Sequence, residues 1–254
     1  MTDNIHIRLL YWDCRGAVQP VRYMLADIVE KYSNVNYTED FEYVAEAFQV
    51  WPKHKQDANI SGPFGTLPVL HWNDEYIIAQ TLPIAQLLAR KFGLYGKPKD
   101  STVDMIFHMA LLDSVVSCAY TDILLNMFTC IWANADFNDK NSSCYRIGKK
   151  MAADTKVLDK LLKQSSTPFF YDQQEPTIAD YFVFEAFTLL RDITPRLLHP
   201  IDDDCKTLQK HEQAMRAQPG IDKYFKLNLL HETVTGSRNE KQWRQQQLNE
   251  KDKQ

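Results

Sequence analysis

Two hydrophobic periods alternate through the first ninety or so residues of the chain. Apolar side chains recur every second position in some stretches and every third or fourth in others, which distinguishes strands from helices. The predicted elements, in order, are a strand at 5–12, a helix at 18–29, a strand at 35–41, an irregular polar stretch at 51–65, strands at 67–70 and 76–79, and a helix at 82–94. This order predicts a small mixed sheet with helices on its faces.

The pattern changes after a linker-like stretch, "GLYGKPKDS", at residues 93–101. From Thr102 to about Leu230 only helical spacing is evident, and the clearest helices are predicted at 103–132, 143–163, 178–191 and 203–217. The predicted organisation is an α/β domain at 1–92, a linker at 93–101, an all-α domain at 102–232 and a polar tail at 233–254 that is either mobile or a frayed helix.

Composition narrows the possible partners. The chain has 254 residues and a net charge of −4, which gives no strong basic field for nucleic acid. No apolar run reaches the ~20 residues of a membrane helix, and the N-terminus lacks the pattern of a signal peptide. The five cysteines have no metal-ligand spacing, so we expect reduced thiols, no metal and a cytoplasmic location.

A proline lies inside one of the predicted strands, in the stretch "PFGTLPVL". Pro68 removes a donor from the sheet, and an edge position would explain it without any function. However, a small βαβ–ββα unit with a proline at the start of its third strand resembles the thioredoxin fold. That resemblance implies a cis Leu67–Pro68 bond and a Leu67 backbone that is available to pair with an extended peptide.

A narrower resemblance covers residues 5–230, on both predicted domains. The chain resembles the cytosolic glutathione transferases, whose thioredoxin-like domain precedes an all-α domain. The segments that carry the resemblance, in order, are "YWDCRGAVQPVRYML", "WPKHK", "PFGTLPVL", "AQTLPIAQLLARKFGLYG", "VDM" and "TIADY". It implies a homodimeric enzyme that conjugates reduced glutathione to small hydrophobic electrophiles. The tyrosine-using classes fit best, and "WPKHK" and "PFG" favour the sigma class.

Tyr11, at the end of the first predicted strand, is the catalytic tyrosine that this resemblance implies. A half-buried strand tyrosine is the alternative. A thiol with a pKa of about 8.5 is mostly protonated at neutral pH, and lowering that pKa by about 2 units takes roughly 2.7 kcal/mol. One hydrogen bond from a phenol to a thiolate supplies about 1.5–3 kcal/mol, which is nearly sufficient.

The same resemblance implies the residues that bind glutathione. Gln80 and Thr81 would hold its γ-glutamyl carboxylate at a helix N-terminus, with Thr81 in place of the usual serine; as a simple N-cap, Thr81 would also be well placed. Asp104 would reach the γ-glutamyl amine of the neighbouring subunit, although a first-turn aspartate also complements the helix dipole. Leu67 and Pro68 would meet the cysteinyl part.

The glycyl end of glutathione is assigned to an irregular loop. Lys55 would meet the carboxylate, with Lys53 as the second choice because the chain is longer here than the sigma pattern. Trp51 and Trp12 would border the same end. An exposed lysine and packing tryptophans are the alternative.

The remaining assignments concern the second substrate and the dimer. The tentative pocket residues for the electrophile are Cys14, Gly16, Ala110 and Ser114. Cys14 also fits a buried apolar side chain or mixed-disulfide chemistry. Phe64 would insert into the partner subunit. Two alternatives to conjugation stay open: a glutathione-dependent isomerase or peroxidase of sigma type, and a non-catalytic ligand-binding or structural protein.

Overall fold

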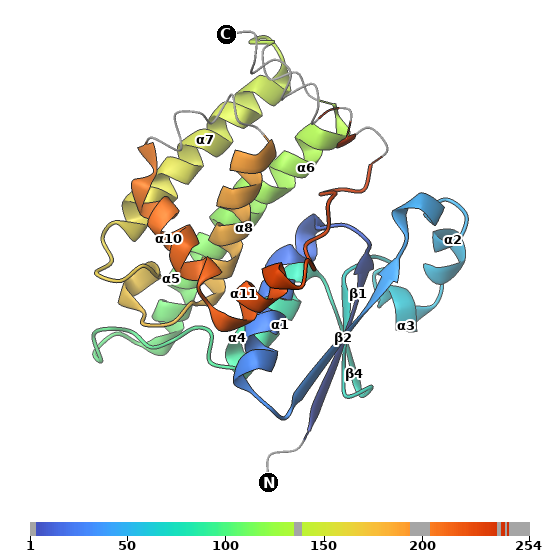
Figure 1. Ribbon diagram of the computed structural model, residues 1–254, viewed down its shortest axis with the longest axis horizontal. Coiled ribbons are helices and arrows are strands. Elements are labelled where there is room, and N and C mark those ends of the chain that lie inside the picture. Colours follow the sequence, from blue (N-terminus) through green and yellow to red (C-terminus); the bar gives the residue numbers. More distant parts are fainter. Residues whose placement is uncertain (1–3, 135–138, 194–203, 238–239, 242, 244–254) are drawn as a thin grey trace. The chain divides into compact units, whose positions relative to one another are not determined.

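The computed structural model describes residues 4–134, 139–193, 204–237, 240–241 and 243. It divides into two compact units (Figure 1): residues 1–92 together with 218–237, and residues 93–217 together with 238–254. The first unit is continuous to residue 92, and the predicted linker at 93–101 belongs to the second unit. Residues 218–237 differ from the predicted organisation, because they pack with the N-terminal unit and not with the helical one.

The first unit is built on a four-stranded sheet of order β2-β1-β3-β4. Parallel pairing joins β1 to β2, whereas β3 is antiparallel to both β1 and β4. The strand bounds are Ile5–Trp12 (β1), Val35–Glu42 (β2), Val69–Trp72 (β3) and Tyr76–Ala79 (β4). Asn73 and Asp74 have φ of 54° and 55°, as a two-residue hairpin turn requires.

The predicted third strand starts two residues later than expected. The Leu67–Pro68 peptide bond is cis, as the resemblance implied, and it precedes Val69, the first residue of β3. Leu67 lies outside the β3 ladder, which begins at Val69.

Helices pack against this sheet and one another. Helix α1 (Gln19–Lys31) buries the apolar face that the sequence predicts, and α4 (Thr81–Lys91) follows β4. In α11 (Pro219–Lys226), a Cβ on Gly220 would overlap the backbone of Ala26 and Asp27 in α1, so the close packing of these two helices depends on glycine. The polar stretch holds two short helices, α2 (Trp51–His54) and α3 (Ala58–Ser61).

The second unit is helical in the part of the chain that the structure describes. The single helix predicted at 103–132 consists of α5 (Met105–Ser117), a π-helical segment at Cys118–Leu124 and α6 (Leu125–Trp132). It is followed by α7 (Ser143–Leu162), α8 (Ile178–Ile193) and α10 (Lys206–Arg216). The start of α8 is a capping box, in which the Asp180 carboxylate accepts from both the N–H and the hydroxyl of Thr177 at 2.7 Å.

The stretch Met105–Trp132 is, by length and composition, apolar enough to cross a membrane, with a hydropathy of 1.4, yet half of it is buried inside the protein. Core helices of soluble proteins can have the same length and apolar composition, so these two properties alone are weak evidence for a membrane span.

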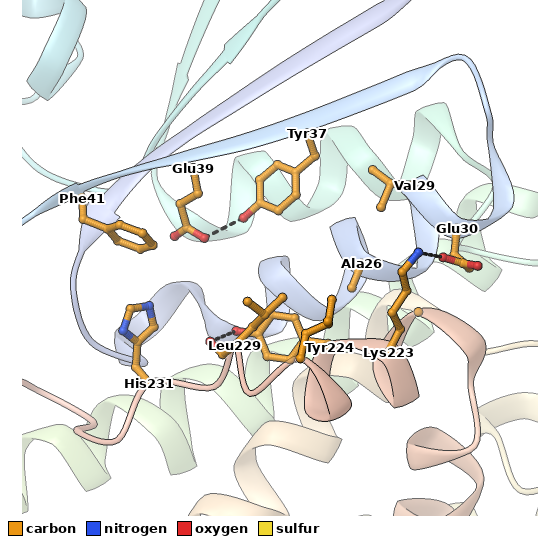
Figure 2. Close-up of a pocket in the computed structure, with 12 residues that line it drawn as sticks. Ala26, Val29, Glu30, Tyr37, Glu39, Phe41, Lys223, Tyr224, Leu229 and His231 are labelled. Carbon is orange, nitrogen blue, oxygen red and sulfur yellow. Dashed lines mark hydrogen bonds and ion pairs between the residues drawn. The ribbon is translucent and has the colours of Figure 1, made fainter.

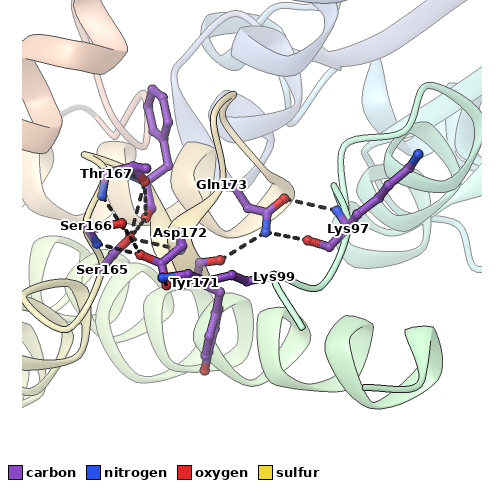
Figure 3. Close-up of polar contacts among 9 residues, drawn as sticks. Lys97, Lys99, Ser165, Ser166, Thr167, Tyr171, Asp172 and Gln173 are labelled. Atoms are coloured by element: carbon purple, nitrogen blue, oxygen red, sulfur yellow. Dashed lines mark hydrogen bonds and ion pairs between the residues drawn. The ribbon is translucent and has the colours of Figure 1, made fainter. Parts of the chain in front are cut away.

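Polar contacts fix the predicted linker to the helical unit (Figure 3). The amide of Gln173 accepts from the Lys97 N–H at 3.0 Å and donates to the Lys97 carbonyl at 2.7 Å. Lys99 forms an ion pair with Asp172 at 3.1 Å, and Asp172 also accepts from the hydroxyl and N–H of Ser166. Residues 97–99 are therefore anchored.

The described part of the polar tail is packed, in contrast to the predicted mobility. Glu240, Lys241 and Trp243 are helical, and the side chain of Trp243 is only 1% exposed. Burial of a large indole stabilises this packing, which polar composition alone did not indicate. The predicted mobility of residues 244–254 concerns positions outside the described residues.

Candidate functional site

Tyr11 lies near the end of β1, and a tight loop encloses its phenol. The side chain is 7% exposed, and its oxygen accepts a hydrogen bond from the Ala17 N–H at 3.0 Å. Gly16, with φ of 50°, packs so closely that a Cβ would overlap the phenol oxygen. A phenol oxygen that accepts from a backbone N–H becomes a better donor through its own proton.

Arg22 fixes the loop that carries these contacts. Its buried guanidinium donates to the carbonyls of Cys14 at 2.7 Å and Arg15 at 3.0 Å, and it pairs with Glu39 at 2.7 Å. The guanidinium carbon lies 5.5 Å from the Tyr11 ring centroid. Burial lowers the pKa of Arg22, but the charge and hydrogen bond of Glu39 outweigh burial, so the net pKa is raised and the side chain stays cationic.

The sequence interpretation missed Arg22. The available signal was a charged residue within the apolar face of the helix predicted at 18–29, since a buried arginine requires partners. The carbonyls and the carboxylate that partner it come from two separate segments, which sequence spacing does not reveal.

A second group of predicted residues surrounds the N-terminus of α4. Gln80, with φ of 74°, is the N-cap, and its side chain donates to the Thr66 hydroxyl at 3.1 Å. Thr81 is the first helical residue, so the alternative of Thr81 as N-cap is wrong. The Thr81 hydroxyl belongs to a side chain that is 2% exposed and has no hydrogen-bond partner among the described residues. An unpaired hydroxyl at a helix N-terminus suits an anionic ligand group.

Two of the residues assigned to the glycyl end, Trp12 at the end of β1 and Trp51 in α2, are in contact. The rings of Trp12 and Trp51 meet edge to face, with centroids 5.0 Å apart. Lys55 caps the end of α2, and its alkyl chain passes Gly65, where a Cβ would lie 3.1 Å from Cε. This contact places Lys55 beside the loop that leads to Leu67. Lys53 and Lys55 are both exposed, so the choice between them stays a prediction.

The residues assigned to the dimer and to the second substrate differ in their burial and contacts. Asp104 is the exposed N-cap of α5 and accepts from the Ile106 N–H at 2.7 Å, while Ser114 donates to the Ala110 carbonyl at 2.8 Å on the same helix. Cys14 is buried, as the apolar alternative predicts. Phe64 is 64% exposed on the first unit. No group of three or more potential metal ligands occurs among the residues that the structure describes.

Comparison with known proteins identifies the family. Residues 121–228 match the family described as "Glutathione S-transferase, C-terminal domain". "Glutathione S-transferase 4" of Caenorhabditis elegans is 30% identical over 187 residues, which cover 72% of this chain and 79% of that protein. The chain belongs to the cytosolic glutathione transferase superfamily.

A further relative of this glutathione transferase is "Hematopoietic prostaglandin D synthase" of Gallus gallus, 33% identical over 132 residues, or 47% of this chain and 59% of that protein.

Solved structures agree on the fold. A Pi-class glutathione S-transferase of Onchocerca volvulus superposes with a TM-score of 0.65 at 19% identity, covering 92% of this chain and 98% of the other. A Nu-class enzyme of Haemonchus contortus gives 0.61 at 22% identity, covering 91% and 99%. The thioredoxin-like domain followed by a helical domain is therefore the glutathione transferase fold.

Proposed function

We propose that this glutathione transferase conjugates reduced glutathione to small hydrophobic electrophiles through a thiolate stabilised by Tyr11. The observation that carries the proposal is the Ala17 N–H donated to the Tyr11 oxygen at 3.0 Å. This bond polarises the phenol, whose O–H donates a hydrogen bond to the glutathione thiolate once the thiol proton has passed to solvent. The thiolate forms the bond to the electrophile and displaces its leaving group, which is halide for an aryl halide, and the tyrosine keeps its proton throughout.

Glutathione would lie along the edge formed by Leu67, Gln80 and Thr81. Its cysteinyl backbone pairs with Leu67, outside the β3 ladder. Its γ-glutamyl carboxylate takes the unpartnered Thr81 hydroxyl and the N-terminus of α4. Its glycyl carboxylate meets Lys55, beside the paired tryptophans.

The proposed working unit is a cytoplasmic homodimer. Phe64 on the first unit and Ile106 and Phe107 on α5 expose large apolar surfaces, at 64%, 73% and 70%. Exposed aromatics of this size are typical of interfaces. Asp104 then completes the glutathione site of the partner subunit.

Turnover of a chromogenic aryl halide with reduced glutathione tests the proposal. We expect saturable conjugation and retention on immobilised glutathione. Binding without turnover of any aryl halide or epoxide would instead support a non-catalytic ligand-binding protein.

One observation favours a second candidate. The similarity to the prostaglandin D synthase of Gallus gallus supports a glutathione-dependent isomerase. The family's second basic residue after "RG" is absent, since Ala17 and Val18 stand there, and this weakens the analogy. Assay with a cyclic endoperoxide in place of the aryl halide separates the two functions.

A further inference from the structure

His54, the last residue of α2, is hydrogen-bonded to Glu42, the last residue of β2. The His54 Nδ1 lies 2.6 Å from the Glu42 Oε1. Because an ionised carboxylate can only accept a hydrogen bond, Nδ1 carries the hydrogen and donates it. The Glu42 side chain is 13% exposed and that of His54 is 40% exposed, so the contact is partly shielded from water. Neither residue is among those assigned to glutathione, to the electrophile or to the dimer.

Glu42 occupies a fixed place at the end of the sheet. Figure 2 shows the side chains of Glu39 and Phe41 on one face of β2. Because side chains alternate along a strand, Glu42 projects from the opposite face. Glu42 is paired with Trp12 in the register of β1 and β2, and its carbonyl accepts from the Asp13 N–H at 3.0 Å. Trp12 and Glu42 therefore lie side by side on the same face, at the ends of adjacent strands.

Helix α2 meets these two strand ends with one side of its single turn. Trp51 and His54 are three residues apart, a spacing that places them on the same side of a helix. Both are partly buried, whereas the two residues between them are exposed. The Trp51 ring contacts the ring of Trp12 with centroids 5.0 Å apart, and His54 donates to Glu42. One aromatic contact and one charge-assisted hydrogen bond thus join α2 to the sheet.

A helix as short as α2 depends on such contacts for its orientation. It has four residues, and an isolated helix of fewer than about 12–15 residues is marginal in water. At its end, the Ser61 hydroxyl donates to the Lys55 carbonyl at 2.8 Å, which joins α2 to α3 and not to the sheet. Lys53 lies within α2 and Lys55 caps it, so the position of either lysine follows the contacts that join α2 to the sheet.

We propose that His54 is a positioning residue for the glycyl end of glutathione. Its hydrogen bond to Glu42 holds α2 so that the lysine side chain meets the glycyl carboxylate. This inference rests on the proposed function, which assigns that carboxylate to a lysine of this loop. His54 acts through α2 and not through the sulfur, so its loss weakens recognition of the glycyl carboxylate and leaves the chemistry at Tyr11 unchanged.

Kinetics with two thiol substrates test this role. The substrates are glutathione and glutathione monoethyl ester, which is esterified at the glycyl carboxylate and has lost that charge. His54→Leu should raise the KM for glutathione about tenfold, since a hydrogen bond to a charged group is worth about that factor or more in an equilibrium. The kcat with glutathione and the KM for the ester should change less than about twofold, because binding of one carboxylate alone is lost.

Further variants separate this role from a general loss of structure. His54→Asn places an amide N–H near the position of Nδ1 and should restore most of the affinity for glutathione. Glu42→Ala should raise the KM as His54→Leu does, and the double variant should raise it no further. His6→Leu makes the same change near the other end of β1 and should leave both KM values unchanged.

Calorimetric titration with glutathione and with the ester keeps this test separate from that of the proposed function. A wild-type protein that binds glutathione more tightly than the ester, but has no turnover, would contradict conjugation and leave the role of His54 measurable as a change in Kd. Equal Kd values of the wild type for both thiols would overturn the inference. So would a folded His54→Leu protein with wild-type affinity for glutathione, or one whose affinities for glutathione and the ester fall equally.

Discussion

At the scale of single residues, the hydrogen bond that the Tyr11 oxygen accepts from Ala17 comes from a loop in which Gly16 packs against the phenol. A Cβ on Gly16 would overlap the phenol oxygen. We therefore expect Gly16→Ala to displace the loop or the ring and to lower turnover about tenfold or more, since an aligned hydrogen bond to a charged group contributes about 1.5–3 kcal/mol.

Gly93→Ala is the matched control for this change. Gly93 also has a positive φ, of 73°, but a Cβ there meets nothing within 4 Å. Both variants should lose roughly 1 kcal/mol or more of stability from backbone strain. Only Gly16→Ala should also lower the rate of conjugation, measured with reduced glutathione and an aryl halide under conditions where both variants are folded. Equal turnover in the two variants would show that the contact between Gly16 and Tyr11 is unimportant.

The carboxylate of Asp172 makes stability depend on pH. Hydrogen bonds from Ser166, and then the interaction with Lys99, lower the pKa of Asp172 from 3.8 to about 2. Because the pKa of Asp172 is lower in the folded protein, the carboxylate stabilises the fold fully above its unfolded pKa. This contribution to the free energy of unfolding disappears as pH falls from about 4 to about 2. Urea unfolding should show Asp172→Asn less stable than wild type at neutral pH, with the difference shrinking across this window. A constant difference would contradict the assignment.

At the scale of elements, sequence periodicity predicts β1, β2 and β4 nearly to the residue, because one face of each strand is apolar or alternation is clear. It misses α2 and α3, since four-residue helices lack a full hydrophobic period. It also merges α5 and α6, because a π-helical segment keeps the same apolar composition.

The packing partner of helix α11 could not be predicted from its local sequence pattern. Its sequence gives no sign of which unit it joins, and the reason is the close approach of Gly220 to the backbone of α1. The role of Arg22 was not predicted for the same reason, because its partners come from β2 and from the loop after β1, which are separate in the sequence. A motif in one short segment places Gln80 and Thr81 at the start of α4, as the structure has them, whereas their role in binding glutathione stays a prediction.

Gly220→Ala tests the packing of α11 on α1. The added methyl meets backbone atoms that cannot rotate away, so we expect a loss of about 1–3 kcal/mol in chemical unfolding. Asp222→Ala, which removes a surface pair with Lys226 and a carboxylate in the first turn of α11, should cost about 1 kcal/mol or less. Similar losses in the two variants would argue against close packing at Gly220.

At the scale of the whole molecule, the proposed dimer explains apolar side chains that one chain leaves exposed. Phe64→Glu should convert the dimer to a monomer and lower glutathione affinity, because Asp104 would no longer reach the partner. Light scattering measures the mass. Tyr43→Glu, a matched change at an aromatic residue that is 57% exposed, should leave the dimer intact. A fully active Phe64→Glu monomer would contradict the shared site.

In the proposed mechanism, Tyr11 stabilises the thiolate of bound glutathione. Ultraviolet absorbance of the thiolate, followed against pH for wild type and Tyr11→Phe with saturating glutathione, measures this most directly. We expect a bound thiol pKa about 2 units below the free value of roughly 8.5 in wild type, returning toward 8.5 in Tyr11→Phe with glutathione still bound. The same depressed pKa in both proteins would contradict it.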